Sequence, residues 1–95
     1  MKPNKVFSLL GLATRAGRTA SGEFMTEKSV KNKTAALVIV GTDASANTKK
    51  NFRDMCSFYH VPYYEYGTKE ELGHAMGKEM RASLAVNGNE GDGGK

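Results

Sequence analysis

Apolar residues in the first part of the chain recur with the spacing of an amphipathic helix. They stand at positions i, i+3, i+4 and i+7, and they are Val6, Leu9, Leu10 and Ala13. Side chains with this spacing share one face of a helix. Pro3 precedes the pattern and Gly17 follows it, as is usual for the two ends of a helix. The spacing predicts a helix over residues 6–16.

A second and weaker helical pattern covers residues 23–32, after a short predicted strand at 18–21. Gly22 opens this helix, and acidic residues in its early turns with lysines in its late turns match the helix dipole. Its apolar face is thin and consists of Phe24, Met25 and Val30.

The middle of the chain contains the strongest strand and helix signals. Residues 35–40 (AALVIV) form a continuous apolar run, which is typical of a strand buried on both faces. A turn at 41–45 leads into a helical pattern at 46–59. Its apolar positions are Phe52, Met55, Cys56 and Tyr59. Residues 61–66 are aromatic and β-branched, and they predict another strand.

The last part of the chain begins with a helix-start signature. Thr68 and Glu71 are spaced as in a capping box, and they predict a short helix that ends near Gly77. Residues 83–86 predict a last strand. Residues 87–95 are rich in glycine and contain no hydrophobic residue, so we expect a disordered tail.

The predicted elements alternate between helix and strand along the whole chain. This alternation favours an α/β sandwich with helices on both faces of a small mixed sheet of four strands. Because a chain of 95 residues has room for one small core, we expect a single domain over residues 1–86. No apolar run is long enough to span a membrane, and polar residues interrupt the N-terminal region where a signal peptide would be apolar. The expected location is cytoplasmic.

Positive charge is concentrated in the first part of the chain. Residues 1–53 carry a net charge of +7, residues 54–95 carry −3, and the whole chain carries +4. A basic surface of this kind favours a polyanionic partner, and nucleic acid is favoured over a membrane because no basic amphipathic helix has a strong apolar face. The alternative is a solvated surface that keeps the protein soluble.

Cys56 and His60 are the residues with the clearest potential for chemistry. They are spaced i, i+4, so they are able to form a catalytic dyad or half of a metal site. Cys56 also completes the apolar stripe of its helix, and free cysteine is among the most buried residue types. We therefore favour a core role for Cys56. Since the sequence also lacks a phosphate-binding glycine motif, it predicts no catalytic residue, no metal site and no cofactor.

Three stretches together resemble the kink-turn RNA-binding family of ribosomal proteins. They are residues 21–28, 37–44 (LVIVGTDA) and 67–83 (GTKEELGHAMGKEMRAS). The family includes the archaeal L-seven-Ae and eukaryotic L-thirty-e proteins, and these motifs are most similar to its bacterial YlxQ-like branch. The resemblance covers residues 5–86 and implies a three-layer α/β/α sandwich that binds RNA.

The resemblance also implies two contact loops for RNA. The first follows the family pattern Gly-x-Asn-Glu-x-x-Lys, in which Gly22 and Lys28 match while Phe24 and Met25 replace the polar pair and Glu23 is the variable position. The second loop precedes the last strand. Its candidate residues are Lys78, Met80 and Arg81. An unstacked base would pack on the methionine while the arginine meets a phosphate.

The residues of the first loop also support binding on physical grounds. The helix that starts at Gly22 offers free backbone N–H groups to a phosphate, and Lys28, Lys31 and Lys33 supply positive charge. The alternative is a plain turn glycine with solvated lysines.

The main hypothesis is a non-enzymatic RNA-binding protein that recognises kinked RNA, has no small-molecule substrate, and resembles a ribosomal or ribosome-associated protein. It would act as a monomer. The alternative hypothesis is a protein–protein adaptor with the same sandwich and no RNA, in which Phe24 and Met25 form an apolar patch.

Overall fold

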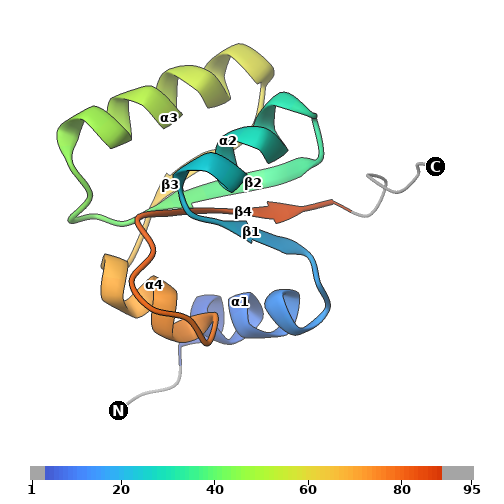
Figure 1. Cartoon of the computed structure of the whole chain (residues 1–95), viewed down its shortest axis with the longest axis vertical. Helices are drawn as coiled ribbons and strands as arrows, with labels where there is room; N and C mark the ends of the chain where they lie inside the picture. The colour runs from blue at the N-terminus through green and yellow to red at the C-terminus, as the bar shows by residue number, and fades with distance from the viewer. Residues whose placement is uncertain (1–3, 89–95) are drawn as a thin grey trace.

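Four helices and four strands alternate along residues 4–88, the part of the chain that the computed structural model describes (Figure 1). The helices are α1 (Lys5–Arg15), α2 (Glu23–Lys31), α3 (Ala46–Tyr59) and α4 (Lys69–Ala75). The strands are β1 (Thr19–Ser21), β2 (Ala35–Val40), β3 (Tyr63–Glu65) and β4 (Ser83–Asn87). All eight match elements predicted from the sequence, with small differences at their ends.

The strands form one mixed sheet in the order β1-β4-β2-β3. Both β1 and β2 are antiparallel to β4, whereas β3 is parallel to β2. Helices α2 and α3 cover one face of this sheet, and α1 and α4 cover the other (Figure 1). The predicted three-layer α/β/α sandwich is confirmed.

Each face of the sheet has its own hydrophobic core. Under α2 and α3 the core includes Val30, Val38, Val40, Phe52 and Cys56. Under α1 and α4 it includes Leu10, Ile39, Leu72, Met76 and Leu84. Consecutive residues of β2 alternate between the two cores, because successive side chains of a strand point to opposite faces. The predicted burial of 35–40 on both faces holds for its second half, while Ala36 is exposed.

The predicted apolar face of α2 is wrong for Phe24 and Met25 and right for Val30, which lies in the core. Phe24 is 73% exposed and Met25 is 45% exposed, while the buried residues of this helix are Thr26, Ser29 and Val30. The reason is tertiary, since α2 packs across β4 through small side chains, with the Ser83 hydroxyl 3.4 Å from that of Thr26. The two large apolar side chains are left on the outside of the molecule.

The last strand, β4, ends one residue beyond the predicted strand at 83–86. Asn87 belongs to β4, and the Gly88 N–H donates to the carbonyl of Thr34 at 2.9 Å, so both residues are ordered where a tail was expected to begin. Residues 89–95, the rest of the expected disordered tail, lie outside the described residues.

Candidate nucleic-acid interface

Three chain connections meet at one edge of the sheet. Because β1 and β2 run antiparallel to β4, the ends of β1 and β2 lie beside the start of β4. Figure 1 shows the β1–α2, β2–α3 and α4–β4 connections together at the left side of the sheet. The two loops that were predicted from the sequence to contact RNA are the first and the third of these connections.

Gly22 forms the turn between β1 and α2 in a conformation that favours glycine. Its φ is 90° and its ψ is 159°, which residues with a side chain rarely adopt. A Cβ there would meet nothing within 4 Å, so the backbone conformation, and not steric crowding, requires glycine. Its N–H donates to the Ser83 carbonyl at 2.9 Å. Since no described side chain caps α2, the backbone N–H groups of its first turn remain open to an anion.

The loop between α4 and β4 folds back across α4. The Lys78 N–H donates to the carbonyl of Gly73 at 2.8 Å, and the Arg81 N–H donates to that of Lys69 at 3.1 Å. A Cβ at Gly73 would overlap the carbonyl oxygen of Glu79, so this close approach requires glycine. The loop holds Met80 at the surface with 60% of its area exposed.

Arg81 joins the two predicted contact loops. Its Nε donates to the Ser21 hydroxyl at 3.1 Å, and one of its terminal nitrogens donates to the carbonyls of Met80 at 3.0 Å and Glu79 at 3.3 Å. The side chain is therefore half-buried and engaged with the protein. It positions the loops, a role that the sequence did not suggest, and its predicted phosphate contact stays a prediction.

The other predicted residues lie at different distances from this edge. Phe24 and Lys28 are both exposed on α2, and Phe24 lies close to the Gly22 turn. Lys33 lies beyond the C-cap of the helix, about 16 Å along its axis from Gly22 at 1.5 Å per residue. The structure therefore does not bring Lys33 to the edge where the two loops meet.

Several basic side chains are neutralised within the protein. Lys31 lies 2.7 Å from Glu27 and Lys50 lies 2.8 Å from Asp54, in both cases as i,i+4 pairs. The hydrogen bond and the negative charge of Glu27 raise the pKa of Lys31. The cations that make no ion pair with any residue in the described range 4–88 include Lys28, Lys33, Lys78 and Arg81. Positive charge on α2 and in the α4–β4 loop is therefore available to a binding partner.

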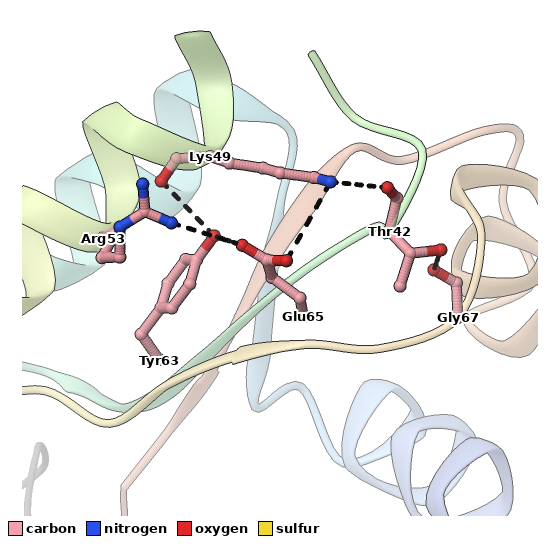
Figure 2. Close-up of polar contacts among 6 residues, drawn as sticks. All are labelled: Thr42, Lys49, Arg53, Tyr63, Glu65 and Gly67. Atoms are coloured by element: carbon pink, nitrogen blue, oxygen red, sulfur yellow. Dashed lines mark hydrogen bonds and ion pairs between the residues drawn. The ribbon is translucent and has the colours of Figure 1, made fainter. Parts of the chain in front are cut away.

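A polar network that the sequence did not predict holds the β2–α3 loop of this edge. Figure 2 shows the carboxylate of Glu65 between Lys49, Arg53 and the Tyr63 hydroxyl, which donates to it at 2.8 Å. The Lys49 ammonium also donates to the Thr42 carbonyl at 2.7 Å. Burial and the bond to Glu65 raise the pKa of Tyr63 above its usual range. Two cations of α3 are thus structural.

The β2–α3 loop is anchored a second time by the segment that joins β3 to α4. The Thr42 hydroxyl donates to the carbonyl of Gly67 at 3.0 Å (Figure 2), and the Asp43 carboxylate accepts from the Lys69 N–H at 2.8 Å. The Gly41 N–H also donates to the carbonyl of Ala82 at 2.9 Å, which joins this loop to the α4–β4 loop. The three loops therefore form one connected, internally bonded edge.

Cys56 is a core residue, as the apolar stripe predicted. It is 1% exposed, and burial raises the pKa of its thiol to about 11, so the reactive thiolate is disfavoured. His60 ends α3 in the left-handed conformation with φ 63° and is exposed. Within residues 4–88, no three His, Cys, Asp or Glu side chains gather in a way that would hold a metal ion. No helix in that range has the length and apolar character to cross a membrane.

Comparison with known proteins decides the family. Residues 4–93 match the ribosomal protein L7Ae/L30e/S12e/Gadd45 family. The chain belongs to this family. The resemblance inferred from the sequence motifs is thereby confirmed.

Curated relatives in the family include bacterial and eukaryotic proteins. The chain is 45% identical over 80 residues to RNA-binding protein YlxQ of Bacillus subtilis (strain 168), and the match covers 84% of this chain and 80% of the relative. It is 42% identical over 77 residues to RNA-binding protein YlxQ of Enterococcus faecium, covering 81% and 75%. The large ribosomal subunit protein eL30 of Tetrahymena thermophila is 30% identical over 81 residues, covering 84% and 78%.

Solved structures share the fold of this member of the L7Ae/L30e family. A protein with unknown function from Bacillus halodurans C superimposes with a TM-score of 0.87 at 40% identity, covering 90% of this chain and 87% of that one. The Giardia lamblia 15.5kD RNA binding protein superimposes with a TM-score of 0.82, covering 94% and 76%. At 22% identity the second likeness shows the fold alone.

Proposed function

We propose that the protein binds structured, kinked RNA at the edge where the β1–α2 and α4–β4 loops meet. The observation that carries this proposal is the pair of hydrogen bonds that joins the loops, from Arg81 to Ser21 at 3.1 Å and from Gly22 to Ser83 at 2.9 Å. These hydrogen bonds join into one surface the two loops that the family resemblance implies as separate RNA contacts. The relatives named RNA-binding protein YlxQ support the same class of partner.

The chemistry of this surface suits an RNA that bends sharply. The open N–H groups of the first turn of α2 offer one kind of phosphate contact. The ammonium of Lys28, which makes no ion pair within residues 4–88, offers another. Met80 offers apolar surface to a base that has left its stack, since sequence-specific RNA recognition targets splayed bases. Phosphate contacts then set position and affinity, while the unstacked base sets selectivity.

In this proposal the protein acts by binding rather than catalysis. The buried thiol of Cys56 and the exposed His60 fit a role without nucleophilic chemistry. We further propose that it acts as a monomer in the cytoplasm and that its RNA is ribosomal or resembles a ribosomal site.

A titration with matched RNAs tests the proposal. A kink-turn RNA and a straight duplex of the same length and composition are compared by filter binding at one salt concentration. We expect the kinked RNA to bind at least about tenfold more tightly, because only its splayed bases and bent backbone reach both loops. Equal affinity for the two RNAs would contradict shape recognition.

The second candidate function is a protein–protein adaptor. The exposure of Phe24 and Met25 on α2 favours it, because neighbouring apolar side chains at the surface often mark a protein contact. The same titration separates the two functions, since an adaptor would bind neither RNA above the non-specific level.

A further inference from the structure

The outer face of α2 carries an aromatic ring followed by cations. Phe24, Lys28 and Lys31 are spaced i, i+4 and i+7, so they share the face that points away from the buried residues of this helix. Together with Glu27 and Asn32 they surround a shallow hollow of about 370 Å³. This face begins at the Gly22 turn and leads away from the edge where the two loops meet.

Phe24 is available for a partner. It is 73% exposed, and thus forgoes the stabilisation that burial of a phenylalanine would give. An aromatic face stacks any nucleobase, because every base has a π-face. The exposed ring lies two residues from the Gly22 turn, the proposed phosphate site.

The two lysines continue the line from the ring. Lys28 makes no ion pair with any residue between 4 and 88, and Lys31 pairs with Glu27 at the surface, where such a pair is weak and exchanges readily. The distance from Phe24 to Lys31 along the helix is about 10 Å at 1.5 Å per residue. That length corresponds to about three nucleotides of a stacked strand, at a rise of about 3.4 Å per nucleotide.

We propose that this face of α2 binds a short unpaired strand that leaves the kinked RNA. One base stacks on Phe24, and the phosphates that follow contact Lys28 and Lys31. The inference rests on the proposed function, because the unpaired strand has to continue from RNA that is bound at the edge where the two loops meet. It extends the two-loop site along α2, sharing Lys28 with that site and adding Phe24 and Lys31.

Two RNAs that differ only in a single-stranded tail test this subsite. One is the kink-turn RNA, and the other carries five additional unpaired adenosines with 2-aminopurine as the first. We expect the tail to increase affinity about tenfold and to quench the 2-aminopurine fluorescence on binding, as stacking on an aromatic ring does. Phe24→Ala removes both effects, and Phe24→Trp restores both.

A matched control distinguishes stacking from general loss of apolar surface. Phe58 on α3 is equally exposed, at 75%, and lies outside the proposed subsite. Phe58→Ala therefore leaves the gain from the tail at about tenfold. If Phe24→Ala preserves that gain and the quenching, or if Phe58→Ala also removes them, the subsite is wrong.

Glu27 supplies a test of the phosphate contacts. Glu27→Gln removes the negative charge that pairs with Lys31, so the tailed RNA should bind about two- to threefold more tightly, with a smaller change for the untailed RNA. Weaker binding of the tailed RNA would overturn the contact at Lys31. Failure of both RNAs to bind the unaltered protein would instead contradict the proposed function, which keeps the two hypotheses separable.

Discussion

At the scale of single residues, Cys56 shows how burial decides chemistry. Its i, i+4 spacing to His60 is compatible with a catalytic dyad, whereas the apolar stripe of its helix predicts a core residue. The structure places Cys56 in the core below α3. The pKa of its thiol is about 11, above the ordinary value of 9.0, because burial disfavours the thiolate.

This shift predicts a dependence of stability on pH. Well below pH 9 the thiol is neutral in both the folded and the unfolded chain. Between about pH 9 and 11 only the unfolded chain ionises, so the free energy of unfolding contributed by Cys56 falls as the pH rises. Chemical denaturation at several pH values should show this loss, and Cys56→Ala should show a smaller one.

Truncation of Cys56 should also affect stability without affecting RNA binding. We expect Cys56→Ala to lower the free energy of unfolding by about 1–2 kcal/mol, because it removes buried sulfur from a packed core. Alkylation of the native protein should be slow. Fast labelling of the native protein, or lost RNA binding in a folded variant, would contradict the core role.

Lys28 and Met80 should contribute to RNA binding by different interactions, Lys28 by its charge and Met80 by its apolar surface. Lys28→Ala should weaken binding to kinked RNA by about 1–2 kcal/mol and lower the salt dependence by about one phosphate contact. Met80→Ala should weaken it by about 1–3 kcal/mol and leave the salt dependence unchanged, because the contact is apolar. Binding curves at several salt concentrations measure both effects. If both variants fold and bind as tightly as the unaltered protein, the two-loop site is wrong.

At the scale of elements, local signals were predictable and long-range contacts were not. The capping box at the start of α4 forms as expected, with Thr68 and Glu71 bonded reciprocally at 3.1 and 3.0 Å, because all its atoms lie within four residues. The orientation of α2 was mispredicted because the proximity of β4 selects small side chains such as Thr26. The bond from Arg81 to Ser21 joins residues 60 positions apart, and no pattern along the chain announces it.

The packing of the α4–β4 loop onto α4 predicts an unusual response to alanine. Gly73→Ala should destabilise the protein by about 1–3 kcal/mol, although alanine favours a helix, because the new Cβ would overlap the backbone at Glu79. The loop must move, so binding to kinked RNA should weaken as well. Thermal denaturation and RNA titration measure the two effects.

A second helical glycine provides the control for this substitution. Gly11 lies in α1, and a Cβ there would meet the Ala75 carbonyl at a tight 3.2 Å without overlap. We expect Gly11→Ala to change stability less than Gly73→Ala and to leave RNA binding as it is. Equal effects of the two substitutions would show that the close approach at Gly73 does not position the loop.

At the scale of the whole molecule, some cations form ion pairs within the protein and others remain available to a binding partner. The excess of positive charge in residues 1–53 is visible in the composition, but composition does not show that α3 pairs its cations with Asp54 and Glu65. Among residues 4–88, cations without an ion pair lie on α2 and the α4–β4 loop, and also at Lys5, Arg15, Arg18 and Lys69. The basic surface is therefore smaller than the sequence suggested, and part of it coincides with the edge where the loops meet.

This division predicts the salt dependence of binding. The logarithm of the affinity for kinked RNA should fall linearly with the logarithm of the salt concentration, with a slope that corresponds to about three to six phosphate contacts. Lys50→Ala should leave the slope unchanged, because Lys50 already pairs with Asp54 at 2.8 Å. Lys78→Ala should lower it, because Lys78 is exposed in the same loop as Met80 at the proposed interface. A flat response would contradict binding through RNA phosphates. A slope that falls equally for both lysines would contradict an interface confined to this edge, since cations across the whole basic surface would then neutralise RNA phosphates.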